Sequence, residues 1–355
     1  MVFDTFLDDA LSLFNKYTNS NKENALKLNP IKNMLSPNNN ETFISKINDI
    51  VFSCKIAGVD SGFVSKRIYF SDLILIKLGG VIFSYDNSVL KKTDYFPSPA
   101  LFPEPILLKN SLEKDEEIQS VSLERLKKEV QLAIDIIKKF FPKYLFIDGS
   151  IVPQYQDKPR NDSVLNSDYK SIIDLFQELY FVAEENNCIL ISTIEDSRGK
   201  RFSQILSNFL ETKNLFEKDS FNNSNDSFLL DFLLNKKERT FCFSYTSDIK
   251  QHPILKDYKK EWSENIFVFY LKASNFDFPL RVEFVSKNPF EKVDEIASIV
   301  YSLSSLHKEY SYPSVLIEAD LRARLKDDDI SIIYNKLIDK LGARIRLRRN
   351  SRPFK

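Results

Sequence analysis

The sequence predicts an α/β protein in which helices flank a mixed β-sheet, and three patterns predict it. Runs rich in β-branched and aliphatic residues at 51–60, 68–78 and 80–85 indicate three successive strands, with Gly79-Gly80 as a candidate hairpin turn. A helical pattern from about residue 120 to 140 follows, and a short apolar strand comes directly after it. A second helix and strand are expected at 169–185 and 188–194. This order of strands and helices indicates a single mixed sheet with helical layers.

The remaining chain predicts additions to this core. Residues 2–17 carry an apolar stripe at helical spacing, residues 18–40 are polar with two prolines and indicate a linker, and residues 86–118 indicate an irregular connection. Further strands are expected at 241–245, 266–273 and 280–285, a loop at 212–227, and helices at 293–306 and 325–341. We therefore expect an N-terminal extension at 1–50, a main domain at 51–341 and a basic tail at 342–355.

Composition limits the chemistry. The formal net charge is zero, so any nucleic-acid site must depend on local patches. Cys54, Cys188 and Cys242 are odd in number and lie in or beside apolar runs, which indicates reduced thiols inside a cell. The sequence shows neither a secretory signal nor an apolar run near the about 20 residues of a membrane span, so we expect a cytoplasmic protein. With two histidines in the chain, carboxylates are the plausible chemical groups.

Two aspartates end apolar runs beside glycines. Asp148 follows the apolar run 144–147 and precedes Gly149, and Asp60 lies between Gly58 and Gly62. The chain has seven glycines, so placing three of them here indicates backbone that turns sharply or lies close to something. An aspartate that only opens a turn gives the same local pattern, and the second copy favours a ligand site.

Glu129 lies on the wrong side of its predicted helix. At about 100° per residue it falls on the apolar face, where an unpaired carboxylate would cost several kcal/mol. A salt bridge or a place at the rim of the apolar stripe explains it in structural terms. The alternative is a metal ligand that faces the strand ending in Asp148.

A basic cluster follows the predicted strand 188–194. Arg198, Lys200 and Arg201 surround a scarce glycine at a strand end, where they could contact phosphates, although a solvated turn has the same composition. The tail carries further basic residues, namely Arg344, Arg346, Arg348, Arg349, Arg352 and Lys355.

Three strands, a helix and another strand form the order of the ribonuclease H-like fold. In that fold, acids of the first strand, the first helix and the fourth strand converge on divalent cations. Asp60, Glu129 and Asp148 match those places, and a late acid, Asp320, follows. Oxygen ligands of this kind hold Mg²⁺ or Mn²⁺ about 3.5–4 Å apart for in-line displacement at phosphorus.

The motifs further resemble the NurA nucleases of archaeal DNA end resection, over roughly residues 55–325. They are Gly58-Val-Asp-Ser-Gly62, Glu129-Val-Gln-Leu-Ala, Ile147-Asp-Gly-Ser150, Ile189-Leu-Ile-Ser192 with Ser197-Arg-Gly199, and Tyr312-Pro with Leu316-Ile-Glu-Ala319. Each motif is short, and their order and spacing carry the resemblance.

The resemblance implies a metal-dependent nuclease, a 5′–3′ exonuclease and single-strand endonuclease that resects DNA double-strand breaks. It implies that Asp60, Glu129 and Asp148 bind manganese or magnesium and that Tyr312 belongs to the active site, where it would stack on or orient a nucleotide. Arg198, Lys200 and Arg201 would contact the DNA. The family forms a homodimer that docks on a hexameric HerA translocase, so these partners are expected as well.

Two positions depart from the family pattern. The chain has Ala319-Asp320 where the family has Ala-His, and Thr193 where a lysine often follows Ile-Ser. Asp320 could ligate a cation but cannot carry protons as histidine does near neutral pH. It could also simply pair with Arg322 or Arg324 on a helix surface, and Tyr312 could pack in the core. A degenerate relative that serves as a DNA-binding or assembly subunit is therefore the alternative function.

Overall fold

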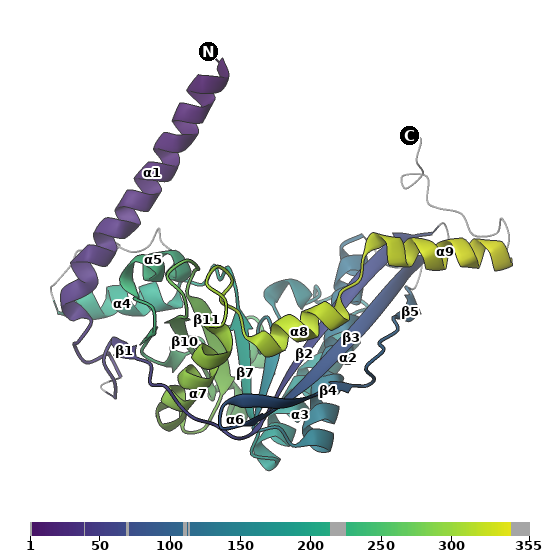
Figure 1. The fold of residues 1–355 in the computed structure, drawn as a ribbon. Coiled ribbons are helices and arrows are strands. Elements are labelled where there is room, and N and C mark those ends of the chain that lie inside the picture. Colours follow the sequence, from purple (N-terminus) through teal and green to yellow (C-terminus); the bar gives the residue numbers. More distant parts are fainter. Residues whose placement is uncertain are drawn as a thin grey trace. The chain divides into compact units, whose positions relative to one another are not determined.

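The computed structural model describes residues 2–38, 40–68, 71–108, 112, 114–213 and 225–341 (Figure 1). The chain forms two compact units. Unit 1 comprises residues 1–50, 193–247 and 265–313, and unit 2 comprises residues 51–192, 248–264 and 314–355. Within the described ranges, no helix is long and apolar enough to cross a membrane. The predicted tail at 342–355 and most of the predicted loop at 212–227 lie outside the described residues, and the predicted domain boundaries stay a prediction.

The sheet of unit 2 has the predicted ribonuclease H-like order. Three consecutive strands form antiparallel pairs: β2 (Lys55–Arg67) with β3 (Asp72–Asp86), and β3 with β4 (Val89–Phe96). Strand β6 (Tyr144–Asp148) pairs parallel with the other edge of β2, and β7 (Ile189–Ile194) lies beside β6. The order β7-β6-β2-β3-β4 confirms the predicted α/β fold class with its mixed sheet. Short β5 (Glu104–Leu107) adds to β3.

Helices cover both faces of this sheet, as Figure 1 shows. Helix α2 (Lys114–Phe140) packs on one face and α8 (Ser314–Ala323) on the other. The glycines of β3 show this, since a Cβ at Gly80 would meet Ile136 of α2 and a Cβ at Gly79 would meet α8. Helix α3 (Asn166–Glu185) packs against α2. Helix α9 (Asp327–Leu341) continues from α8 and buries Ile330 and Tyr334 against the far ends of β2 and β3. The four-residue helix α6 (Lys260–Ser263) completes this unit.

Glycines let α8 approach the sheet backbone. A Cβ at Gly58 would lie 2.9 Å from the carbonyl oxygen of Val315, and one at Gly79 would lie 2.8 Å from that of Ala319. A Cβ at Gly62 would overlap the carbonyl oxygen of Ala323. The structure thus confirms the expectation of close backbone approach at Gly58 and Gly62, and it assigns α8 as the element that approaches.

In the described residues, unit 1 contains an antiparallel sheet and helices. Its strands are β1 (Ile44–Lys46), β8 (Glu238–Thr240), β10 (Ile266–Lys272) and β11 (Leu280–Val285), with β9 (Phe243–Ser244) paired to β10. Its helices are α1 (Val2–Leu28), α4 (Arg201–Thr212), α5 (Asp226–Leu233) and α7 (Pro289–Ser304). Helices α1, α4 and α5 share an apolar core with the strands, and the end of α1 packs on α4 and α5 through Ala25 and Leu28.

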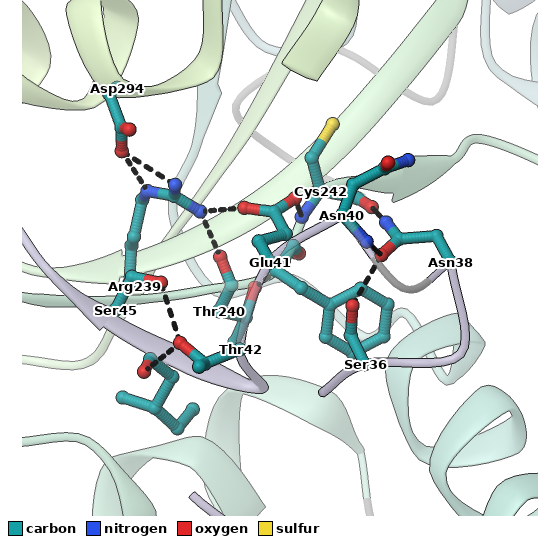
Figure 2. Close-up of polar contacts among 12 residues, drawn as sticks. Ser36, Asn38, Asn40, Glu41, Thr42, Ser45, Arg239, Thr240, Cys242 and Asp294 are labelled. Carbon is teal, nitrogen blue, oxygen red and sulfur yellow. Dashed lines mark hydrogen bonds and ion pairs between the residues drawn. The ribbon is translucent and has the colours of Figure 1, made fainter. Parts of the chain in front are cut away.

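A buried arginine ties three segments of unit 1 together (Figure 2). The Arg239 side chain, 3% exposed, pairs with Glu41 at 2.6 Å and with Asp294 of α7 at 2.6 Å. Glu41 also accepts the backbone N–H of Cys242 at 2.7 Å. Because the guanidinium has a partner on each side, its charge is neutralised in the interior. These contacts fix the segment before β1 to β8 and α7.

Some local predictions were wrong. The predicted helix 2–17 continues to Leu28, so residues 18–28 are helical rather than a linker. Gly79-Gly80 lies within β3 and not in a hairpin, because α8 and α2 each need a glycine there. The predicted irregular stretch 86–118 contains β4, β5 and the start of α2. All three cysteines are free thiols, as predicted.

Candidate active site

Two aspartates lie at the point where β6 ends. Val59 of β2 pairs with Ile147 of β6, so the next residues, Asp60 and Asp148, follow side by side. Strand β6 stops at Asp148, whereas β2 continues to Arg67. Asp60 is 7% exposed and accepts the backbone N–H of Ser61 at 2.6 Å, while Asp148 is exposed. The end of a buried strand thus presents one buried and one exposed carboxylate.

Glu129 reaches the same place from α2. It is 3% exposed, and the Ser61 hydroxyl donates a short hydrogen bond to its Oε2. Arg125, one turn earlier, donates from Nη1 to Glu129 Oε2 at 3.1 Å and to Ser61 Oγ at 3.2 Å. The ion pair that the sequence left open therefore exists. The role of Glu129 as a metal ligand stays a prediction.

Asp320 approaches from α8. It follows Ala319, whose carbonyl oxygen lies against Gly79, so the glycine contacts set its position over the sheet. The Asp320 side chain is 48% exposed and forms an ion pair with Arg324, four residues along the helix. This is the surface pairing that the sequence offered as one alternative. Asp320 is also near enough to Asp60 for its charge to raise the pKa of Asp60.

The four carboxylates, which we call the acidic cluster, influence one another. The pKa of Asp60 is raised to about 6, chiefly by burial and further by the charges of Asp148 and Asp320, while the Ser61 N–H and Arg125 oppose the rise. The pKa of Glu129 is raised to about 7, chiefly by burial; Arg125 and Ser61 oppose the rise, and the charges of Asp60 and Asp148 contribute to it. Asp60, Glu129, Asp148 and Asp320 therefore form one electrostatic site.

A cavity of about 80 Å³ adjoins the acidic cluster, lined among others by Arg125, Glu129, Asp148, Ser150 and Gln154. Gly149 turns the chain out of β6 with φ at +79°, a conformation that favours glycine.

The loop that walls this cavity is held by a buried carboxylate. Asp157, 4% exposed, accepts the Ser122 hydroxyl of α2 at 2.6 Å and the backbone N–H of Gln154 at 2.8 Å. This fixes the loop to the helix that carries Arg125 and Glu129.

The donor chemistry of the acidic cluster fits a hard divalent cation, because carboxylate oxygens are the ligands that Mg²⁺ and Mn²⁺ prefer. The raised pKa of Asp60 fits as well, since a cation would relieve the repulsion among the acids. In the structure as it stands, no three His, Cys, Asp or Glu side chains of the described residues are grouped closely enough to hold a metal ion. Glu129 and Asp320 are each paired with an arginine instead.

The other predicted site residues belong to unit 1, whereas the acidic cluster belongs to unit 2. Tyr312 is 7% exposed, donates from its hydroxyl to the Thr193 carbonyl at 3.1 Å, and stacks on Tyr310 with ring centroids 6.0 Å apart. This is the core packing that the sequence offered as the alternative. Its role at the active site stays a prediction.

The predicted phosphate-binding residues also lie in unit 1. Arg198 and Lys200 are exposed, and Arg201, which begins α4, has its pKa lowered by burial. Their contact with DNA stays a prediction, and the arginines of the tail lie outside the described residues.

Sequence reasoning missed two residues of the site, Ser61 and Arg125. A signal for Arg125 was present, because a residue four positions before Glu129 shares its helix face. Ser61 gave no such signal. Its side chain alternates with that of Asp60 along β2 and so faces α2, which only the pairing of the sheet with α2 reveals.

Comparisons with known proteins agree with this architecture. The family model of the NurA domain matches residues 54–325. The structure is similar to the NurA nuclease from Sulfolobus solfataricus, with TM-score 0.60 and 19% identity over 96% of this chain and 98% of that one. A NurA crystal structure matches with TM-score 0.51 and 12% identity over 96% and 98% of the two chains. One with manganese matches with TM-score 0.50 and 13% identity over 94% and 98%.

No curated protein matches the sequence. The family model nevertheless spans most of the chain, from the strand of Asp60 to the helix of Asp320, and the chain therefore belongs to the NurA family.

Proposed function

We propose that this chain is a nuclease that hydrolyses DNA phosphodiester bonds with a divalent cation, manganese or magnesium, held by the acidic cluster. The observation that carries the proposal is the electrostatic coupling of Asp60, Glu129 and Asp148 near the end of β6 in a chain of the NurA family. A related NurA structure contains manganese, which supports the same choice of ion here.

Each carboxylate of the acidic cluster would have its own role in holding the cation. Asp60 and Asp148 would hold the cation and Glu129 would complete its ligands, with Asp320 as a further oxygen donor from α8. A divalent cation in such a site activates water and stabilises the leaving oxygen at phosphorus. Ser61 and Arg125 orient Glu129 Oε2, and burial of Glu129 and Asp60 keeps bulk water away from those carboxylates.

Finer aspects of the proposal rest on family membership. We infer 5′–3′ exonuclease and single-strand endonuclease activity in the resection of DNA double-strand breaks. The chain would act as a homodimer together with a hexameric HerA-type ATPase. Arg198, Lys200, Arg201 and Tyr312 would contribute to DNA binding.

Cleavage assays with substituted proteins test the proposal. Asp60→Asn and Asp148→Asn should each abolish Mn²⁺-dependent cleavage of single-stranded DNA, because each removes a ligand charge. Asp174→Asn is a matched control, since Asp174 is an exposed carboxylate on α3 outside the acidic cluster. Undiminished cleavage by the Asp60 and Asp148 variants would reject the assignment.

A degenerate DNA-binding or assembly subunit is the second candidate. Three observations favour it: Asp320 stands in place of the family histidine, its carboxylate pairs with Arg324, and the Tyr312 hydroxyl is engaged by a backbone carbonyl. Calorimetric titration with Mn²⁺ separates the candidates, because the nuclease requires binding of the cation and the scaffold does not.

A further inference from the structure

Arg125 is a positive charge that contacts the buried part of the acidic cluster. It opposes the rise in pKa of both Asp60 and Glu129. Its side chain is 28% exposed, and it lines the cavity beside Asp148. A guanidinium that served only as a counter-ion for buried Glu129 would have no need to face this cavity.

The Arg125 guanidinium has hydrogen-bond donors that it does not use. In the described part of the chain, Arg125 donates hydrogen bonds from Nη1 alone, to Glu129 and Ser61, while Nε and Nη2 donate none. Arginine presents its donors in a planar fork that matches phosphate oxygens. Arg125 can therefore keep its contact with Glu129 through one edge and offer the other edge to an anion in the cavity.

Charge decides when an anion can bind there. Without a cation, the carboxylates of Asp60 and Glu129 offset the charge of Arg125, and Asp148 lines the same cavity, so the site repels a phosphate. A divalent cation held by the acidic cluster would add two positive charges and offset part of the charge of Glu129. Arg125 is then no longer neutralised by the acids, and its unused donors become attractive to a phosphate.

We propose that Arg125 binds a non-bridging phosphate oxygen of the nucleic-acid strand in this cavity, and that the contact forms when the acidic cluster holds a cation. The inference rests on the proposed nuclease function and adds a substrate-binding residue to it. Arg125 would place the strand next to Asp148, the exposed carboxylate of the cluster.

The test measures binding rather than cleavage. The full chain is titrated into a fluorescent phosphorothioate oligothymidine, which resists cleavage, with Mn²⁺ or with EDTA, and Mn²⁺ binding is measured separately by calorimetry. The variant is Arg125→Gln. Lys127→Gln is the matched control, because Lys127 is exposed on the same helix and the same charge is lost.

We expect Mn²⁺ to strengthen oligonucleotide binding by the wild-type chain and by Lys127→Gln. In Arg125→Gln this gain should be about tenfold smaller, as expected for one charged hydrogen-bonded contact. The salt dependence of its binding should flatten by about 0.7 in slope. Mn²⁺ itself should still bind, since the carboxylates are retained and a repelling charge has been removed.

Other outcomes overturn the inference. Arg125→Gln with wild-type oligonucleotide affinity and salt slope would mean that Arg125 contacts no phosphate. Loss of Mn²⁺ binding in a folded Arg125→Gln chain would mean that Arg125 only positions Glu129. If wild type binds no Mn²⁺, the nuclease proposal fails, and the role of Arg125 fails with it. If wild type binds Mn²⁺ and only the expected loss of oligonucleotide affinity in Arg125→Gln is missing, the role of Arg125 fails and the nuclease proposal stands.

A second pair of variants covers the case in which Arg125→Gln does not fold, because it leaves the buried Glu129 charge unpaired. Glu129→Gln and the double variant Glu129→Gln/Arg125→Gln differ only in the guanidinium. Because Glu129 is itself a proposed cation ligand, the two are compared at a Mn²⁺ concentration that calorimetry shows to saturate both. The double variant should bind the oligonucleotide about tenfold more weakly with Mn²⁺ present. Equal affinities in this pair would also overturn the inference.

Discussion

Gly62 of β2 and Ala323 of α8 touch backbone to backbone, so closely that a Cβ on Gly62 would overlap the Ala323 carbonyl oxygen. Gly58 and Gly79 make similar contacts with the same helix. Asp60 lies between two of these glycines on β2 and faces the same side of the strand. The close packing of α8 on the strand backbone therefore determines how near Asp320 comes to Asp60.

Gly62→Ala should displace α8. The added methyl group meets backbone rather than a flexible side chain, so we expect a loss of about 1–3 kcal/mol in the free energy of unfolding. Urea unfolding measures it. Gly149→Ala is the comparison, because a Cβ there meets nothing within 4 Å and only the positive φ is penalised. Wild-type stability of Gly62→Ala would show that α8 does not sit on the glycine.

Metal-free Asp60→Asn should be more stable than wild type at pH 8. The pKa of Asp60 is about 6 in the folded chain against 3.8 for an aspartate in water, so folding disfavours the ionised form by roughly 3 kcal/mol. Because the folded pKa is raised, wild type loses this stability as the pH rises from about 4 to 6. Chemical unfolding in EDTA across this range tests it, and an identical pH dependence in both proteins would contradict it.

The groups around Asp60 set the size of this effect. Asp148 and Asp320 act in the same direction as burial, whereas Arg125 and the Ser61 N–H oppose it. Below pH 4 the acid is protonated in both the folded and the unfolded chain, so wild type and Asp60→Asn should converge in stability there.

Asp320→Asn should reduce the rise in melting temperature that Mn²⁺ produces, if Asp320 is a ligand from α8. Arg324→Gln is the matched control. It breaks the same exposed ion pair, worth at most about 1 kcal/mol, and keeps the carboxylate. Its Mn²⁺-induced shift should equal or exceed that of wild type. Equal shifts in Asp320→Asn and wild type would assign Asp320 to the surface ion pair alone.

Association through α1 is a further expectation for the proposed homodimer. The first half of this helix exposes Leu7, Leu11 and Phe14, at spacings of four and three residues that fit a helix-to-helix contact. Leu11→Glu/Phe14→Glu should shift the mass in light scattering from dimer to monomer. A monomeric wild type at micromolar concentration would refute the dimer, and a dimeric double variant would place its interface elsewhere.

Local sequence signals were enough to predict which acids lie at a strand end or on a buried helix face, and the general order of strands and helices along the chain. An apolar run that ends in Asp148 predicts a buried strand with a carboxylate at its end, because burial and alternation are properties of neighbouring residues. The angular position of Glu129 predicted its burial in the same way, and the structure confirms it at 3% exposure. The strand and helix signals then predicted a ribonuclease H-like order, which the sheet of unit 2 has. The second and third predicted strands, 68–78 and 80–85, are however the single strand β3, and the third strand of the sheet is β4, in a stretch predicted to be irregular.

Contacts between distant segments decided the rest. Gly79-Gly80 has the composition of a turn, and it stays in β3 because Ala319, far along the chain, must reach the strand backbone. Asp60 and Ser61 are neighbours in sequence, yet pleating sends one side chain toward α8 and the other toward Glu129 on α2. The pair of Arg125 and Glu129 lies on one helix, whereas the contact of Ser61 with both depends on how α2 packs on β2. Periodicity reports which face is buried, but only tertiary packing determines the partner that a buried charge meets.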